Sequence, residues 1–470
     1  MNTERHKKLW IPITMLLAIW GGATKLAADE KPNIIYILAD DLGYGDLRCY
    51  GQRILWTPHL DQMAEQGLRF TQHYAGSTVC APSRCVLLTG LHTGHAKIRN
   101  NYPAVLGNDD STIAKLLRSA GYHTGCVGKW GLGDPLEDDD PARCGFDDFF
   151  GYVTMYHAHN FFPEFIVRNG VREALRNELD PRWKNRKDGM GVAQKKVDYV
   201  PALLQLEALS FIERNQERPF FLYYALNLPH ANNEGRHTPH GMEVDDYGEF
   251  ERRDFPRNEK GFARMVQLVD TYVGQILDLL RELDLDHNTL VMFSSDNGPH
   301  IEGGHRVEYF DSNGVLRGIK RDMHEGGIRV PLIARWPGKV EPETTSELIS
   351  GFQDMFPTFA ELAGVTPSPT DGISMMPTLL GDDERQQHHR HLYWEFPHRQ
   401  RSPTSKQQVN VQRQAVRWGR WKAVRDTVES GNIHFELFDL DRDLGEQNNI
   451  AADYPKISEE MQRIMDHESE

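Results

Sequence analysis

Five short runs of the chain are mainly apolar and rich in β-branched or aromatic residues. They are Asn33–Ala39, His123–Val127, Phe220–Asn227, Leu290–Ser294 and Val330–Arg335. Because these runs lack the polar alternation of a half-exposed strand, they predict strands that are buried on both faces of a sheet.

The segments between these runs repeat apolar residues at the spacing of helices. The expected helices are Pro58–Gln66, Thr112–Ala120 with Ser111 as N-cap, Ala202–Asn215 and Phe262–Leu283. Buried strands that alternate with helices predict an α/β fold with a large, mainly parallel sheet flanked by helices. The polar segment 160–200 is expected to form an insertion over the sheet edge.

The pattern changes after about residue 385. Strands are expected at Leu392–Phe396, Gln414–Arg425 and Phe435–Leu440, and a helix near Lys456–Met465. This predicts a small C-terminal α+β subdomain with an antiparallel sheet. We therefore divide the chain into a main domain, 29–385, and a C-terminal subdomain, 386–470.

The first 28 residues have the layout of a signal peptide. A basic stretch at Arg5–Lys8 precedes an apolar run, Leu9–Ala23, and small residues follow at Ala27 and Ala28. We expect cleavage near Asp29, no stable membrane insertion afterwards, and a secreted or periplasmic protein. The formal net charge of −15 argues against binding to nucleic acid.

Polar residues follow the predicted strands. Asp40 and Asp41 come after the first strand, Lys129 after the second, His230 after the third, and Asp296 with Asn297 after the fourth. Ligands bind at the carboxyl ends of strands in open α/β sheets, so these residues are expected at one edge. The side-chain oxygen atoms of Asp40, Asp41, Asp296 and Asn297 suit Ca²⁺ or Mg²⁺ rather than zinc. The alternative is that the dipeptides Asp40-Asp41 and Asp296-Asn297 are ordinary turn or helix-cap residues.

A second candidate lies at Cys80–Arg84, which fits the pattern C-x-P-x-R. Pro82 suits a first helical turn, which puts Cys80 at a helix N-terminus where anions are stabilised. Arg84 lies one turn further on the same face. The alternative is a small buried cysteine beside a helix. The chain has five cysteines, an odd number, and none of them has zinc-binding spacing.

The stretch VCAPSRCVLLTG at Val79–Gly90 resembles the signature of type I sulfatases, the formylglycine-dependent, arylsulfatase A-like branch of the alkaline phosphatase superfamily. Further similar motifs, in order, are PNIIYILADDLGYGD at 32–46, GYHTGCVGKWGLG at 121–133, SSDNGP at 294–299, LRGIKRDMHEGGIRVPLIARWPG at 316–338 and FELFDLDRDLGEQNNIA at 435–451. The resemblance implies that 29–385 is a sulfatase catalytic domain that hydrolyses sulfate esters to an alcohol and inorganic sulfate. Sulfated carbohydrates are the expected substrates.

The resemblance also implies the site. A maturation enzyme would convert Cys80 to Cα-formylglycine, whose hydrate attacks sulfur with one hydroxyl and expels sulfate through the other. One calcium ion would be held by Asp40, Asp41, Cys80, Asp296 and Asn297. The implied catalytic residues besides Cys80 are Arg84, Lys129 and Lys320, which stabilise charge, and His230, which donates a proton to the leaving oxygen.

Gly131 departs from the family pattern, because many relatives have a histidine there. The histidines near motif segments that could replace it are His92, His95, His300, His305 and His324. Two alternatives to a sulfatase stay open. One is a phosphodiesterase or phosphonate monoester hydrolase on the same scaffold, and the other is a non-catalytic carbohydrate-binding relative. Arg99 and Arg168 are possible substrate contacts.

Overall fold

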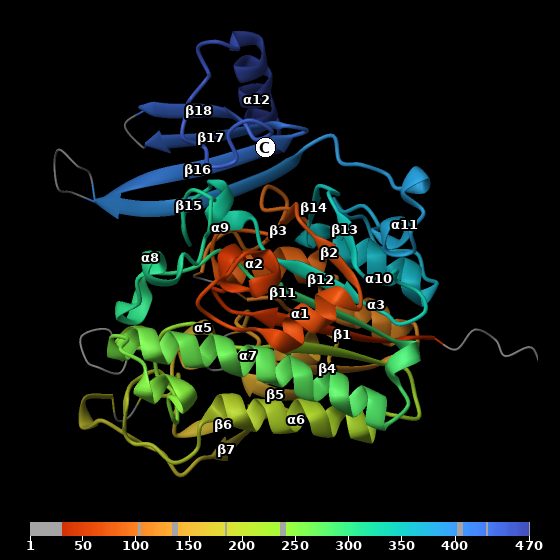
Figure 1. Cartoon of the computed structure of the whole chain (residues 1–470), viewed down its shortest axis with the longest axis vertical. Helices are drawn as coiled ribbons and strands as arrows, with labels where there is room; N and C mark the ends of the chain where they lie inside the picture. Colours follow the sequence, from red (N-terminus) through yellow and green to blue (C-terminus); the bar gives the residue numbers. More distant parts are fainter. Residues whose placement is uncertain are drawn as a thin grey trace, which may run out of the picture. The chain divides into compact units, whose positions relative to one another are not determined.

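A ten-stranded sheet lies at the centre of the main part of the computed structural model (Figure 1). The structure describes residues 31–101, 105–133, 140–183, 186–235, 241–401, 408–428 and 431–469, so the predicted signal peptide lies outside the described residues. The strands, in spatial order, are β13 (Thr344–Ser346), β2 (Leu68–Phe70), β12 (Leu332–Arg335), β11 (Thr289–Ser295), β1 (Asn33–Ala39), β10 (Phe220–Ala225), β4 (His123–Lys129), β5 (Asp148–Tyr152), β6 (Phe165–Arg168) and β7 (Val171–Ala174).

The five central strands, from β11 to β5, run parallel. Leu38 of β1 is in register with Ser294 of β11 and with Ala225 of β10. Their carboxyl ends therefore finish at one edge of the sheet, as the sequence predicts for a mainly parallel sheet. The outer strands β12, β6 and β7 pair antiparallel with their inner neighbours.

Helices cover both faces of this sheet. Ile35 and Ile37 of β1 pack on the side of α1 (Pro58–Glu65), α6 (Val200–Arg214) and α7 (Arg257–Glu282). The alternate residues Ile34 and Tyr36 face the side of α2 (Cys80–Thr89), α3 (Ile113–Ser119) and α10 (Met355–Ala363). The predicted α/β fold is thus confirmed.

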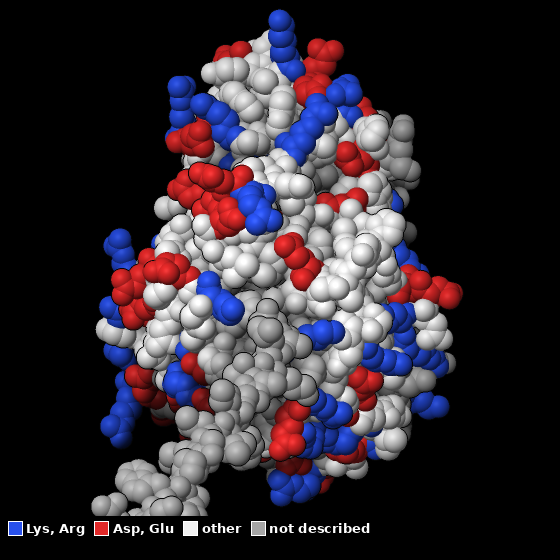
Figure 2. Space-filling view, turned by 90° about the vertical axis from the view of Figure 1, so that its right-hand side faces the viewer, with Lys and Arg blue, Asp and Glu red and all other residues white. Residues whose placement is uncertain are grey.

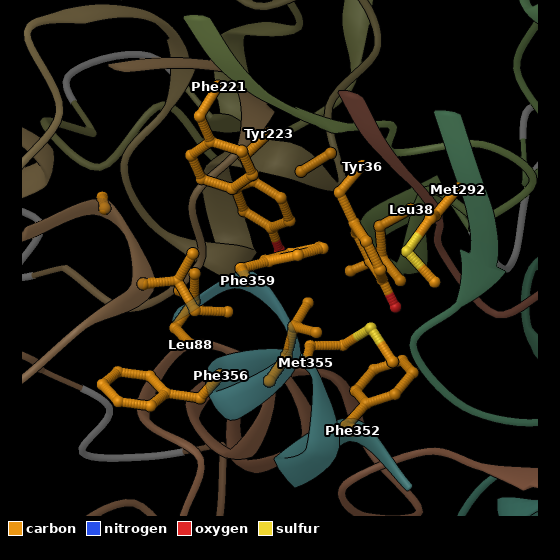
Figure 3. Close-up of a cluster of buried hydrophobic side chains, with 14 of the residues drawn as sticks. Tyr36, Leu38, Leu88, Phe221, Tyr223, Met292, Phe352, Met355, Phe356 and Phe359 are labelled. Atoms are coloured by element: carbon orange, nitrogen blue, oxygen red, sulfur yellow. The ribbon is translucent and has the colours of Figure 1, made fainter. Parts of the chain in front are cut away.

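The apolar cluster between the sheet and α10 also holds α2. Figure 3 shows Leu88 of α2 beside Phe359 of α10, with Tyr36 and Phe221 coming from the sheet. The rings of Tyr36 and Phe359 meet edge to face at 6.2 Å. Because every residue of α2 is buried, its N-terminus is fixed against the sheet edge.

The C-terminal residues form a four-stranded antiparallel sheet of β15 (Leu392–Arg401), β16 (Gln408–Trp418), β17 (Trp421–Val428) and β18 (Ile433–Asp439), with α12 (Pro455–Glu468) on one face. Trp394 Nε1 donates a hydrogen bond to the carbonyl of Ala75, 2.8 Å away. Lys422 forms buried ion pairs with Glu325 at 3.0 Å and Glu446 at 3.4 Å. The described residues from Lys31 onward form one compact unit, so the division at residue 385 stays a prediction.

Shorter elements connect these parts. They are β3 (His73–Tyr74), α4 (Asp140–Arg143), α5 (Met155–Ala158), β8 (Glu178–Leu179), β9 (Ala193–Lys195), η4 (Asn233–Gly235), η7 (Glu302–Gly304), α8 (Val307–Phe310), α9 (Glu325–Ile328), β14 (Ser350–Gly351) and α11 (Met376–Leu379).

Three local predictions were wrong. Thr112, not Ser111, caps α3, because its Oγ1 accepts the N–H of Lys115 at 3.2 Å. The predicted strand Gln414–Arg425 is two strands, β16 and β17, since the chain turns at Gly419 with φ +54°. Part of the segment 160–200 extends the sheet edge instead of lying over it, because β6 and β7 add to β5, whereas β8 and β9 pair only with each other.

Charged side chains of both signs are interspersed over the described part of the face in Figure 2. Within the described residues, no helix is both long and apolar enough to cross a membrane. All five cysteines lie in the described residues, and no disulfide joins any two of them.

Candidate active site

The polar residues predicted at the strand ends come together at one edge of the sheet. Strands β1, β4 and β11, the loop after β10, the start of α2 and the loop before α9 all contribute. Nine of these residues are at most 4% exposed to solvent. They are Asp40, Asp41, Cys80, Arg84, Lys129, His230, Asp296, Asn297 and Lys320. The structure thus groups all nine sequence-predicted residues in one buried site.

Cys80 is the first residue of α2, as the C-x-P-x-R pattern predicts. Its Sγ lies 3.4 Å from Asp40 Oδ1 and 3.8 Å from Asp41 Oδ1. Burial, together with the nearby charge of Asp296, raises the pKa of the thiol well above its usual range. This favours the protonated thiol, and Cys80 does more than fill space in its apolar cluster, because its Sγ also faces two carboxylates.

Cations neutralise the carboxylates around Cys80. Lys129 Nζ lies 2.7 and 2.9 Å from the two carboxylate oxygens of Asp40. Arg84 binds Asp296 Oδ2 through Nε at 3.0 Å and Nη2 at 2.8 Å, and its Nη1 donates to the carbonyl of Lys129. Both cations are fully buried, so these pairs are held in a medium of low polarity.

The two carboxyl groups respond differently to this environment. Burial alone would raise the pKa of Asp40, but the nearby positive charges, with that of Lys129 first and that of Arg84 also contributing, hold it well below its ordinary value. Burial, with repulsion from Asp40, raises the pKa of Asp296 to about 7. Two like charges that share a site separate in this way unless a further cation joins them.

The donor set fits a hard divalent cation. Asn297 donates from Nδ2 to Asp41 Oδ1 at 2.7 Å and to the carbonyl of Gly298, which fixes the amide orientation. Its Oδ1 is buried, and no group in the described residues donates a hydrogen bond to it. The ligand atoms of Asp40, Asp41, Cys80 and His230 lie within 4.8 Å of one another. A buried oxygen without a donor beside clustered carboxylates is the chemistry that calcium satisfies.

His230 and Lys320 meet on another side of Cys80. The ring nitrogen Nδ1 of His230 donates to the carbonyl of Ala231 at 2.7 Å, so Nε2 carries no proton in the neutral ring. Lys320 Nζ donates to that Nε2 at 3.2 Å and to Asp41 Oδ2 at 2.7 Å. Burial, followed by the charge of Lys320, lowers the pKa of His230 well below its usual range.

Glu302 and Arg321 belong to the same network, although the sequence analysis missed them. Glu302 Oε2 accepts from Lys320 Nζ at 3.1 Å, and its Oε1 accepts from Arg321 Nη2 at 2.6 Å. Asn233 Nδ2 also donates to Glu302 Oε2. Arg321 directly follows Lys320, which is the only signal that could have marked it.

An apolar side chain lies next to Gly131. A Cβ at this position would be 3.3 Å from Cγ of Met155 and 3.7 Å from Cδ of Arg84. The backbone has φ +74°, which favours glycine. Met155, from α5, thus occupies space beside the position where the family resemblance implies an imidazole.

Each of the five candidate replacement histidines has a ring nitrogen bound to another group, although Nε2 of His305 is buried without a hydrogen-bond partner in the described residues. Four pair with carboxylates elsewhere: His92 with Glu468, His95 with Asp371, His305 with Glu259 and His324 with Glu436. His300 lies beside His230, with ring centroids 5.9 Å apart, but its Nε2 binds the carbonyl of Pro229 and its Nδ1 accepts the N–H of Glu302. His159, which no motif marks, stacks on His230 instead.

The two arginines suggested as substrate contacts pair elsewhere. Arg99 binds Glu395 at 2.7 Å, and Arg168 binds Glu173 and Glu207 at 2.8 Å. These ion pairs support the packing of β15 and β6 rather than the site.

A family model described as "Sulfatase" matches residues 32–365, and the model "N-sulphoglucosamine sulphohydrolase, C-terminal" matches residues 318–470. The chain belongs to the sulfatase family. This membership confirms the predicted enzyme class, a sulfuric ester hydrolase.

Relatives of this sulfatase cover nearly its whole length. Arylsulfatase A of Bos taurus is 33% identical, over 96% of this chain and 88% of the relative. An N-acetylgalactosamine-6-O-sulfatase of Bacteroides thetaiotaomicron is 30% identical, over 93% of each chain. A solved structure of Ps i-CgsB in complex with k-i-k-neocarrahexaose has a TM-score of 0.75 at 28% identity, covering 94% of this chain and 93% of that one.

Proposed function

We propose that this sulfatase hydrolyses sulfate esters of carbohydrates to an alcohol and inorganic sulfate, with Cys80 as the modified nucleophile. One observation carries the proposal. The Cys80 side chain lies at the buried N-terminus of α2, where its Sγ faces the carboxylates of Asp40 and Asp41. Cations from three other points of the fold surround those carboxylates, which suits an anionic ester such as a sulfate monoester better than a neutral substrate.

The residues around Cys80 have separate roles in this proposal. The N–H groups of Arg84, Lys129 and Lys320 offset the negative charge that grows on the sulfate oxygens in the transition state. His230 and Lys320, which share a hydrogen bond, hold a proton on the side where the alcohol leaves.

Asp40, Asp41, Asp296 and Asn297, with the modified Cys80, would hold one calcium ion. The buried Oδ1 of Asn297 and the clustered carboxylates support this ligand set. When bound, calcium supplies positive charge that polarises the sulfate oxygens and acidifies the nucleophile. Asp41 is held for this task at φ +66°, with its N–H bound to Asp296 Oδ1 at 3.0 Å.

The nucleophile requires a maturation enzyme that oxidises Cys80 to Cα-formylglycine. As its hydrate, formylglycine supplies one hydroxyl to attack sulfur and a second whose proton loss reforms the aldehyde and releases sulfate. The protonated thiol described above has no such second step. We further propose a secreted or periplasmic location and a catalytic domain of 29–385 with a C-terminal subdomain of 386–470.

The proposed carbohydrate substrate is supported by two relatives. One is named an N-acetylgalactosamine-6-O-sulfatase, and the solved structure of Ps i-CgsB contains k-i-k-neocarrahexaose. A solved phosphonate monoester hydrolase of Agrobacterium radiobacter shares the fold at 20% identity and a TM-score of 0.62. That likeness concerns the fold alone, so it does not favour phosphonate or phosphodiester chemistry.

The test is to co-express the chain with a formylglycine-generating enzyme and to examine residue 80 by peptide mass spectrometry. We expect loss of the thiol at Cys80 and turnover of 4-nitrophenyl sulfate well above that of an aryl phosphodiester. Cys80→Ala should abolish turnover, whereas Cys85→Ala, in the same buried helix, should keep the modification. Full activity with an unmodified Cys80, or a preference for the phosphodiester, would contradict the proposal.

A further inference from the structure

Exposure of the polar side chains around His230 increases in one direction. The side chains of His230 and Lys320 are 2% exposed, and that of Glu302 is 13% exposed. Arg321 reaches 41%. This gradient identifies the side of the site that opens to solvent, away from the fully buried carboxylates beside Cys80.

His159 lies at the same opening, on the flat face of His230. The two rings are stacked with centroids 4.8 Å apart and an angle of 14°. Nδ1 of His159 faces the carboxylate of Glu234 at 3.4 Å. An ionised carboxylate only accepts hydrogen bonds, so Nδ1 carries the proton and Nε2 is left as an acceptor.

Arg321 is held at the opening by its backbone. Its φ is +80°, an uncommon conformation for a residue with a side chain. Its N–H donates to the carbonyl of Thr78 at 3.0 Å, and its carbonyl accepts from Arg413 Nη1 at 2.6 Å. These contacts place the guanidinium against Glu302.

We infer that His159, Glu302 and Arg321 bind hydroxyl groups of the saccharide unit that carries the sulfate ester. The inference rests on the proposed sulfatase activity. A sugar hydroxyl both donates and accepts, so it matches an imidazole acceptor, a carboxylate acceptor and a guanidinium donor. An apolar alcohol such as a sterol would cover Nε2 of His159 and the guanidinium N–H groups of Arg321 that do not bind Glu302, and it would leave these atoms without partners, which is costly.

The experiment compares two kinds of substrate on the modified enzyme. They are 4-nitrophenyl sulfate, whose leaving group has no neighbouring hydroxyl, and methyl galactoside monosulfates bearing sulfate at O-3, O-4 or O-6. The variants are His159→Ala and Arg321→Gly, the latter because glycine adopts φ +80° without strain. His287→Ala, an exposed histidine outside the site, is the matched control.

We expect each variant to lower kcat/KM on the preferred galactoside sulfate by about 10–100-fold, since a hydrogen bond to a substrate hydroxyl is lost. The loss on 4-nitrophenyl sulfate should be at least tenfold smaller. Replacing a neighbouring hydroxyl of the sugar by hydrogen should lower kcat/KM of the wild type by a similar factor. The same replacement should lower kcat/KM of the variant little further, because the variant has already lost the hydrogen bond.

Equal losses on both substrates, or full additivity between variant and deoxygenated sugar, would overturn the inference. The inference would also be overturned if the wild type hydrolysed 4-nitrophenyl sulfate but none of the sugar sulfates. In that case the proposed hydrolysis of sulfate esters would still hold, and only the sugar contacts would be wrong. If modified enzyme hydrolysed neither kind of sulfate ester, the proposed function itself would fail.

Discussion

Nζ of Lys320 donates a hydrogen bond to Nε2 of His230 across 3.2 Å, while Nδ1 of the same ring donates to the carbonyl of Ala231. The neutral ring therefore has its proton on the side away from Lys320. The proton nearest to Nε2 belongs to the ammonium group, so the two side chains act as one unit.

We expect His230→Ala to affect poor leaving groups most. General acid catalysis contributes roughly 10²–10⁴-fold, and a stable phenolate needs little of it. A series of aryl sulfates with phenols of rising pKa should show a steeper loss of kcat/KM for His230→Ala than for the wild type. Because of the shared hydrogen bond, Lys320→Ala should lower all rates and also steepen this dependence.

Lys129→Ala is the matched lysine control for this series. Lys129 binds Asp40 and, within the described residues, forms no hydrogen bond with the His230 ring, so its loss should slow every ester by a similar factor. Identical losses for His230→Ala on good and poor leaving groups would remove this residue from proton transfer.

Removal of calcium should lower stability as well as activity. Binding at one hundred times the dissociation constant stabilises a fold by about 2.7 kcal/mol, so chelation should lower Tm by on the order of 5 °C. Asp296→Asn should lower turnover and reduce this calcium-dependent shift, because one carboxylate ligand is lost.

Asp286→Asn provides the control for the calcium experiment. Asp286 forms an ion pair with Arg335 at 2.6 Å, outside the site. Its variant should keep the full calcium-dependent shift in Tm measured by thermal unfolding. The ligand assignment would be wrong if chelation left both Tm and turnover of the wild type unchanged.

Asp46 should make the wild type less stable as the pH rises. Burial raises its pKa to about 7, and its Oδ2 accepts the N–H of Gly43 at 2.7 Å. Because the pKa of Asp46 is raised in the folded state, its protonation contributes fully to the stability of the fold below pH 3.8, the ordinary pKa. That contribution is lost as the pH rises through about 7. Asp46→Asn lacks this titration, so its free energy of unfolding relative to the wild type should rise between pH 4 and 7.

The relative gain in this comparison should approach about 4 kcal/mol at most. Urea unfolding of both proteins at pH 4, 5, 6 and 7 measures it directly. A difference that stays constant over these four pH values would show that the Asp46 carboxyl titrates normally.

Gly131→His should not restore the imidazole found in many relatives without cost. The added Cβ meets Met155 at 3.3 Å, and φ +74° is unfavourable for a side chain. We expect a loss of about 1–3 kcal/mol in stability, seen as a lower Tm. The double variant with Met155→Ala should recover part of it.

Gly364→His separates the two causes of this loss. Gly364 has φ +70° and no atom within 4 Å of an added Cβ, so its variant suffers the backbone effect alone. Should the two histidine variants lose the same stability, contact with Met155 would have no part in the effect.

The sequence predicts the buried centre of the site well, because its residues follow parallel strands. Asp40 and Asp296 come directly after β1 and β11, and adjacent parallel strands finish at the same edge whatever the loops do. Cys80 was predictable for a similar reason, since a proline two residues later marks the helix start.

The opening of the site could not be predicted in this way. His159, Glu302 and Arg321 lie in loops or single turns, and tertiary contacts, rather than periodicity, decide where their side chains point. The antiparallel direction of β12 escaped prediction for a related reason: an apolar run shows that a strand is buried but not which way it runs.

The burial of α2 determines when Cys80 can be modified. All ten residues of the helix are buried beneath the sheet and α10, so in the folded chain its thiol cannot enter the active site of another protein. Under the proposed maturation, oxidation and folding would compete in time, and each molecule that folds first would keep an unmodified thiol. The specific activity of a preparation would then depend on the fraction of chains that are oxidised before they fold. Later exposure of the folded protein to the maturation enzyme would not raise this activity.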